Sequence, residues 1–180
     1  MRSGASFASI TIAGVLALAA CAGPPLAMPD TQEGGNGPVR VAFVEPERFT
    51  DIATSPVNAS EREANLRELR RHIERRAGAL LAEGQRLEVT ITDIDMAGQA
   101  EPWRARAPEM RIVRDVYPPR IDVRFRLVDG EGMVLRSGQR SLRDPMFMAR
   151  GGRYDGERLK FEKALLDDWI EREFGSAPGD

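Results

Sequence analysis

Hydrophobic and polar residues follow one another along the chain in a pattern that predicts one folded domain containing both strands and helices. Strands are expected at Val39–Val44, Leu87–Met96, Met110–Val113, Arg120–Leu127 and Met133–Leu142. Apolar residues at helical spacing predict helices at Ser60–Gly84 and Glu157–Phe174. The last two strands are joined by the hairpin signal Asp129–Gly132. This order predicts an α+β fold, in which a mostly antiparallel sheet of four to five strands has two helices packed on one face.

The first predicted helix has a recognisable beginning and one apolar stripe. Ser60 and Glu63 have the S-x-x-E spacing of a capping box. The stripe consists of Leu66, Leu69, Ile73, Ala77 and Leu80. His72 lies beside this stripe, among arginines, so we expect it to be an exposed helix residue.

The strand at Leu87–Met96 carries the most suggestive chemical pattern. Regular alternation places Asp93 and Asp95 on the face of Leu87, Val89 and Ile91, so this apolar face turns acidic at its end. Two carboxylates at this spacing are close enough to share a cation or to shift each other's pKa. A calcium ion takes about six to eight oxygen ligands, so further carboxylates would have to join them. The candidates are Asp51, Glu101, Asp115 and Asp144.

The alternative for Asp93 and Asp95 is structural. Both carboxylates would then pair with arginines or cap turns where the strand ends. Partners are abundant, because 24 of the 26 basic residues are arginine. The Asp-x-Asp pattern also lacks the Gly and Glu of a calcium-binding loop.

Arginines form the second candidate site. Arg120, Arg124 and Arg126 share one face of their strand. A guanidinium group suits phosphate or carboxylate, so this face is a candidate for binding an anionic envelope polymer or a lipid headgroup. The alternative is a merely solvated face, because carboxylates lie nearby in the sequence. Trp103, in the Pro-, Ala- and Arg-rich segment before this strand, is a candidate partner-facing aromatic residue.

Composition narrows the possible function classes. The chain has 180 residues, and 26 basic against 28 acidic side chains give a net charge of −2, which excludes a generally basic nucleic-acid-binding domain. A single Cys and a single His exclude a disulfide framework, a C-x-x-C redox pair and a Cys-rich zinc site. The sequence contains no H-E-x-x-H motif, nucleophile elbow or Gly-rich phosphate loop. No cofactor is expected.

The N-terminal segment is typical of an export signal. Arg2 precedes the uncharged run Phe7–Ala20 of 14 residues, which is shorter than the ~20 apolar residues of a membrane-spanning helix. Leu18-Ala19-Ala20-Cys21 then resembles the lipobox of bacterial lipoproteins. That resemblance implies cleavage before Cys21 and acylation of its thiol. The alternative is ordinary signal-peptide cleavage, which would leave Cys21 unmodified.

These features predict the organisation of the whole chain. Residues 1–20 are a lipoprotein-type signal peptide, 21–38 a flexible tether, 39–174 a single globular domain and 175–180 a disordered tail. The tether prediction rests on four Pro and four Gly between Ala22 and Pro38. By resemblance to lipoproteins of double-membrane bacteria, Ala22 after the Cys implies an outer-membrane anchor facing the periplasm.

Four segments in this order resemble a bacterial exported family, domain-of-unknown-function family 3016. They are Val41–Asp51, Leu87–Gly98, Arg111–Ile121 and Phe161–Trp169. Met96 departs from the expected Leu, and Tyr117-Pro118-Pro119 from the expected Trp-Pro. The resemblance covers about Val39–Phe174 and implies export and a single domain. It implies no activity and no site residues.

The leading functional hypothesis is a non-enzymatic lipoprotein domain. It would be held at a membrane through Cys21 and would act as a binding or structural component of the cell envelope, with an envelope protein or anionic polymer as partner. The alternative is a metal-dependent periplasmic hydrolase that uses Asp93 and Asp95, with the metal activating water. A purely structural domain is the third hypothesis.

Overall fold

The computed structural model describes residues 37–55, 58–100 and 111–175. The strands of its main sheet are β1 (Val39–Phe43), β2 (Arg86–Asp95), β5 (Arg120–Val128) and β6 (Val134–Arg143). The long helices are α1 (Ala59–Gly78) and α3 (Lys160–Phe174). The short elements are η1 (Pro46–Arg48), β3 (Gln99–Ala100), β4 (Arg111–Ile112), α2 (Phe147–Arg150) and η2 (Gly151–Tyr154).

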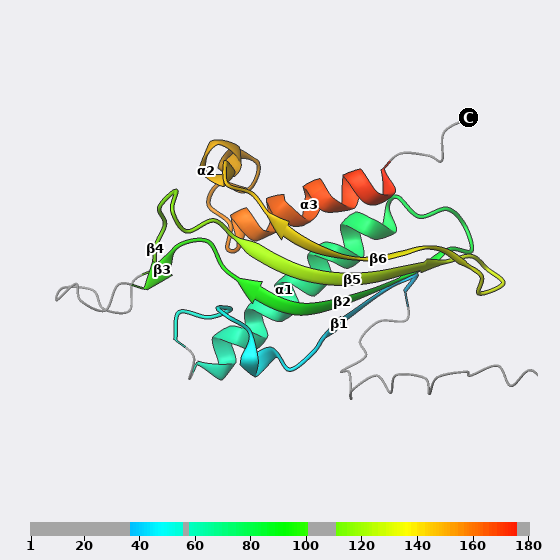
Figure 1. The fold of residues 1–180 in the computed structure, drawn as a ribbon, viewed down its shortest axis with the longest axis horizontal. Helices are drawn as coiled ribbons and strands as arrows, with labels where there is room; N and C mark the ends of the chain where they lie inside the picture. Colours follow the sequence, from blue (N-terminus) through cyan, green and yellow to red (C-terminus); the bar gives the residue numbers. More distant parts are fainter. Residues whose placement is uncertain (1–36, 56–57, 101–110, 176–180) are drawn as a thin grey trace, which may run out of the picture.

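The strand order in the main sheet is β1-β2-β5-β6. β1 and β2 run parallel and are joined through α1, whereas the other neighbouring strands are antiparallel. Both long helices lie on the same face of the sheet (Figure 1). The predicted α+β fold with a mostly antiparallel sheet is therefore confirmed. β3, which pairs with β4, and α2 were not predicted, because such short elements leave no periodic pattern in the sequence.

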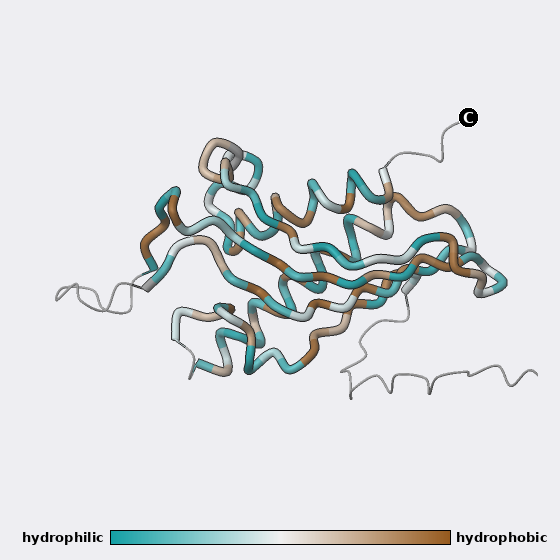
Figure 2. The backbone as a smooth tube through the Cα atoms, in the orientation of Figure 1, coloured by the Kyte–Doolittle hydropathy of each residue, from teal (hydrophilic) through white to brown (hydrophobic). Residues whose placement is uncertain are grey.

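The hydrophobic core fills the space between the sheet and the two long helices. Alternate residues of β2 and β5 are buried, and apolar and polar segments alternate along these strands in Figure 2. Trp169 of α3 contacts Phe125 of β5 edge to face, with ring centroids 5.9 Å apart. The largest side chains of the core include Trp169, Leu69, Ile73, Leu87, Ile91 and Ile94. Their burial supplies the main force that holds α1 and α3 against the sheet.

The ends of α1 differ from the prediction. The N-cap is Asn58, whose side chain accepts a hydrogen bond from the backbone N–H of Glu61 at 3.1 Å. The predicted capping box at Ser60 and Glu63 is therefore wrong by two residues. The helix ends at Gly78, and Gly84 lies beyond it at a φ of +79°. Because Leu80 falls after the helix, it leaves the predicted stripe and is 41% exposed.

A β-bulge at Thr92 changes which residues of β2 face the core. The register with β5 shifts between Ile91 and Asp93, and one extra residue reverses the alternation that follows it. Ile94 rather than Asp93 therefore continues the buried face, and Ile94 is fully buried. The prediction that Asp93 and Asp95 share a face with Leu87 is wrong for this reason. Both carboxylates lie on the opposite, solvent-facing side.

The edge strand β6 buries Leu142 in the core, but elsewhere it turns arginines toward the helices. Arg136 and Arg140 are the register partners of core-facing residues of β5. Arg140 pairs with Glu173 of α3 at 3.0 Å and lies over the Phe125 ring at 5.2 Å, and Arg136 donates to the Glu173 carbonyl. Gly138 makes room between them, since a Cβ there would lie 2.6 Å from the Arg140 guanidinium. Inward-pointing charges of this kind protect an edge strand against pairing with other chains.

Candidate functional site

The face of the main sheet that points away from α1 and α3 is the open face. Cross-strand register arranges its side chains in rows that run across β2, β5 and β6. From the β5–β6 hairpin outward, the rows are Glu88–Arg126–Ser137, Thr90–Arg124–Gln139, Asp93–Asp122–Ser141 and Asp95–Arg120–Arg143. The open face therefore brings together five of the predicted candidates, Asp93, Asp95, Arg120, Arg124 and Arg126.

Arg120 joins two carboxylates that face each other across the strands. Its guanidinium donates to Asp93 at 2.6 Å and to Asp122 at 2.9 Å. Asp93 is held further by the backbone N–H of Thr50 at 2.7 Å and the Thr50 hydroxyl at 2.8 Å. Asp93 therefore has the structural contacts that the alternative interpretation described, an arginine partner and a loop backbone.

Arg124 and Arg126 differ in their surroundings, although both are exposed. Arg126 lies 3.5 Å from Glu88, its register partner. Arg124 is flanked in register by Thr90 and Gln139, which carry no charge. Within the described residues, Arg124 makes no ion pair, so its guanidinium is open to an anionic group.

Asp95 lines a cavity of about 330 Å³ at the end of the open face. Burial raises the pKa of its carboxyl; Arg120 lowers this pKa, whereas Asp51 and Asp93 raise it further. Within the described residues, the Asp95 carboxylate has no hydrogen-bond partner. The other lining residues that matter for binding chemistry are Thr50, Asp51, Gln99, Tyr117, Arg120 and Arg143. A cavity of this size suits a small molecule, and its charges are mixed.

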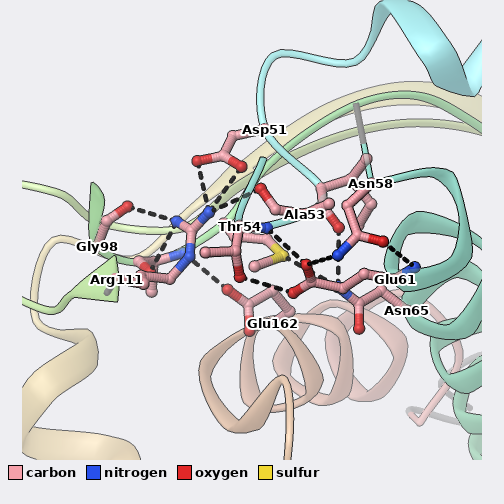
Figure 3. A network of polar contacts seen from close by, with 12 residues as sticks. Asp51, Ala53, Thr54, Asn58, Glu61, Asn65, Gly98, Arg111 and Glu162 are labelled. Atoms are coloured by element: carbon pink, nitrogen blue, oxygen red, sulfur yellow. Dashed lines mark hydrogen bonds and ion pairs between the residues drawn. The ribbon is translucent and has the colours of Figure 1, made fainter. Parts of the chain in front are cut away.

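Arg111 supports one wall of this cavity, because it contacts the lining residues Asp51 and Gly98, as Figure 3 shows for its polar contacts. Its guanidinium donates to both oxygens of Asp51 at 2.7 Å and to the Gly98 carbonyl at 2.7 Å. Asp51 also forms an isolated parallel bridge with Asp95. The close contacts leave no room for a side chain at residue 98, where a Cβ would lie 2.6 Å from the Ile112 carbonyl oxygen. Arg111 thus fixes the loop after β1 against the end of β2.

Glu162 of α3 lies beneath the same wall. Its side chain is 3% exposed and accepts a hydrogen bond from the backbone N–H of Ala97 at 2.7 Å. Burial raises the pKa of Glu162, and the Ala97 amide and the Arg111 guanidinium offset part of that rise. The final helix is therefore tied to the cavity through a buried carboxyl group. Glu162 was not identified from the sequence, because a polar residue in an amphipathic helix is predicted to face solvent.

The chain was compared with protein families, curated proteins and solved structures. A family model described as a protein of unknown function (DUF3016) matches residues 37–172. The chain belongs to this family. No curated protein and no solved structure matches it.

The segments that carry the resemblance to DUF3016 converge in space. The cavity is lined by Asp51 of the first segment, Asp95 of the second and Tyr117 of the third. Glu162 of the fourth segment lies directly below, on the Ala97 amide. The cavity is thus the place where segments far apart in this DUF3016 sequence meet.

A second buried polar cluster joins α1, η2 and α3. The Asp167 side chain is completely buried, and it accepts hydrogen bonds from His72 at 2.8 Å, Arg76 at 2.9 Å and Tyr154 at 2.5 Å. Arg153 lies 3.2 Å from its second oxygen. The prediction that His72 is exposed is wrong, since it is 1% exposed. Its partner comes from the other long helix, which the sequence of α1 alone cannot reveal.

The hydrogen-bond partners of Asp167 counteract the effect of burial on its pKa. Burial alone would raise the pKa of Asp167, but the hydrogen bonds from His72, Tyr154 and Arg76 outweigh it and hold this pKa well below its ordinary range. Burial and the hydrogen bond to Asp167 raise the pKa of Tyr154 to about 12. The cluster therefore stabilises a charged carboxylate and a neutral phenol between the two helices.

Other predicted candidates are not brought together. Cys21, Glu101 and Trp103 lie outside the described residues. Asp144 accepts a hydrogen bond from the Met146 backbone at 2.9 Å, just before α2. Within the described ranges, no group of three or more His, Cys, Asp or Glu side chains is placed to hold a metal ion. No helix of the described part of the chain is long and apolar enough to span a membrane.

Proposed function

We propose that the chain is an exported lipoprotein of the bacterial cell envelope, with a non-enzymatic domain that binds an anionic partner through the open face of its sheet. The anchor would be Cys21, and the domain would face the periplasm from the outer membrane. Support for the anchor comes from the Leu18–Cys21 segment and the tether that follows it. The observation that carries the binding proposal is Arg124 at the centre of the open face, which is exposed and makes no ion pair with any residue that the structure describes.

The neighbours of Arg124 suit the recognition of phosphate or carboxylate groups. A guanidinium group offers several donors in a fixed plane, which match two oxygens of such an anion. Thr90 and Gln139 flank it in register and supply additional hydrogen-bond donors. Arg120 is engaged with Asp93 and Asp122, so it is a weaker candidate for the same task. The partner would be an envelope protein or an anionic envelope polymer that presents such groups.

Photo-crosslinking in cells tests the binding proposal. A photo-reactive residue is introduced at Gln139, next to Arg124 in register, in the full chain. We expect a discrete crosslinked product that disappears in the Arg124→Ala background. The matched control is Arg67→Ala, since Arg67 is an exposed arginine of α1 and its removal changes the net charge equally. A crosslink that persists without Arg124, or that is lost equally with Arg67→Ala, would contradict the proposal.

Membrane fractionation tests the anchor separately. We expect the wild-type protein in the membrane fraction and the Cys21→Ser variant in the soluble fraction, since stable anchoring requires the acyl chains. If both forms are soluble, the lipid anchor is excluded and Cys21 follows an ordinary cleavage site.

The second candidate function is a metal-dependent hydrolase. The observation that favours it is the Asp95 carboxylate, which opens to the cavity beside Asp51 and Asp93. Against it, Asp51 is engaged with Arg111 and Asp93 with Arg120, so a cation would have to compete with both arginines. Metal titration of the chelator-treated chain distinguishes this candidate from the binding proposal.

A further inference from the structure

Large apolar side chains are exposed at the end of the domain where the chain enters the sheet. They are Leu80 at 41%, Met133 at 63%, Val134 at 45% and Leu135 at 49% exposure. They come from the loop after α1 and from the β5–β6 hairpin, which lie at the same end of the molecule (Figure 1). The start of β6 is correspondingly apolar in Figure 2. We call this set of four residues the apolar tip.

The two loops of the apolar tip are in contact and border a groove. A Cβ on Gly84 would lie 3.7 Å from Gly130, so the backbones of the two loops pack closely. The adjoining groove has a volume of about 520 Å³, and its apolar walls include Leu81, Leu127 and Phe174. The apolar tip is therefore continuous with an open apolar groove.

The chain enters the domain at this same end. Val39, the first residue of β1, is the register partner of Leu87 near the start of β2, and the Leu87 backbone N–H donates to the Pro38 carbonyl at 2.8 Å. Seventeen residues separate Cys21 from Val39. A flexible tether of that length has a root-mean-square span of about 23 Å. The ten residues of β2 add about 34 Å before the opposite end of the sheet is reached.

We propose that the apolar tip contacts the phospholipid surface in which Cys21 is anchored. This inference rests on the proposed lipid anchor, because the tether brings the bilayer within reach of this end of the domain first. Charges at the tip do not select anionic lipids, since Glu83, Asp129 and Glu131 of the two loops lie near Arg86 at the start of β2. The contact is therefore apolar, and it leaves the cavity at the opposite end of the sheet, away from the anchor point.

Fluorescent labelling tests this orientation with two matched methionines. Met133 in the apolar tip is 63% exposed, and Met146, beside α2 at the other end of the sheet, is 66% exposed. Each is changed to Cys in the full, acylated chain, in which the Cys21 thiol is blocked by its lipid. An environment-sensitive fluorophore is attached, and the protein is reconstituted into phosphatidylcholine vesicles. Thermal unfolding without vesicles checks that both labelled variants fold like the wild type.

The label at Met133→Cys is expected to shift its emission to shorter wavelength on reconstitution and to be quenched by nitroxide-labelled lipids. The label at Met146→Cys is expected to keep the emission it has in buffer. Equal emission and equal quenching at the two positions would overturn the inference while leaving the lipid anchor intact. Wild-type protein that does not float with the vesicles would overturn both.

A second copy of the chain is the competing occupant of the apolar tip. It would produce a shielded label at Met133→Cys without vesicles, and the shielding would grow with protein concentration. That outcome would also overturn the inference. The expected result is a shift that requires vesicles and does not depend on protein concentration.

Discussion

Asp93 of β2 and Asp122 of β5 are direct cross-strand partners on the open face, although both side chains are carboxylates. Like charges in this position destabilise a sheet. The two are held together by Arg120, whose guanidinium lies 2.6 Å from Asp93 and 2.9 Å from Asp122. Arg120 therefore links the two strands, and its positive charge explains how two acidic residues can be neighbours there.

We expect Arg120→Met to destabilise the protein by about 1–3 kcal/mol, because two partly buried carboxylates lose their shared hydrogen-bond donor. The cost is expected to fall when Asp122→Asn is already present, since the repulsion between the two carboxylates is then gone. A double-mutant cycle of urea denaturation measures this coupling. Additive effects of the two substitutions would show that Arg120 does not act by joining the carboxylates.

Asp93 and Asp95 are two residues apart and should respond in opposite directions to the same substitution. Asp93→Asn is expected to lower the melting temperature, because Thr50 and Arg120 lose a charged acceptor. Asp95→Asn is expected to raise it at neutral pH. The pKa of Asp95 is raised in the folded protein, so its charged form destabilises the fold. The gain in melting temperature should therefore shrink as the pH falls, because wild-type Asp95 then becomes protonated. Melting curves over a pH series test both predictions, and equal losses at neutral pH would contradict them.

Asp167→Asn should be one of the most destabilising single substitutions in the domain. It removes a buried charge from His72, Arg76 and Tyr154, and breaking a buried pair costs roughly 3–5 kcal/mol. The pKa of Asp167 is depressed in the folded protein, so its stabilisation is complete above its ordinary value of 3.8 and is lost as the pH falls through the lower, folded-state pKa. The difference in unfolding free energy between wild type and variant should therefore stay constant down to about pH 3.8 and shrink below it. Glu171→Gln, at an exposed position of the same helix, is the control and should have a much smaller effect.

Tyr154 should titrate with a pKa of about 12, raised from 10.0. The neutral phenol is the stabilised form, so its contribution to stability is complete below the ordinary tyrosine range and is lost as the pH rises toward this value. Ultraviolet absorbance during an alkaline titration reports the formation of tyrosinate. Tyr154→Phe is expected to remove this late step. If the step that disappears is an earlier one, the Tyr154–Asp167 hydrogen bond does not hold in solution.

The hydrolase alternative predicts metal binding. After treatment with a chelator, the full chain is titrated with calcium, magnesium, manganese or zinc, and its melting temperature is recorded. A metal that binds the native state must raise this temperature, and Asp95→Asn should abolish the rise. An unchanged melting temperature with each of the metals would exclude the metal-dependent hydrolase, and the non-enzymatic proposal predicts this outcome.

The alternation and spacing of apolar residues determined most of the fold. These local patterns predicted the four long strands, the two long helices, the β5–β6 hairpin and the mostly antiparallel sheet, because buried faces repeat with the period of their element. They also predicted that Arg120, Arg124 and Arg126 share one face, since no bulge interrupts β5 between them. For the candidate site, the sequence singled out these three arginines together with Asp93 and Asp95, but it placed the two carboxylates on the wrong face.

Tertiary structure alone decided which side Asp93 faces and where His72 lies. The bulge at Thr92 is a property of the pairing between β2 and β5, and the alternation within β2 gave no sign of it. His72 and Asp167 are 95 positions apart, and each is polar, so each reads as a solvent-facing residue of its own helix. Burying either one alone would be costly; together they satisfy each other, and that compensation exists only once α1 packs against α3.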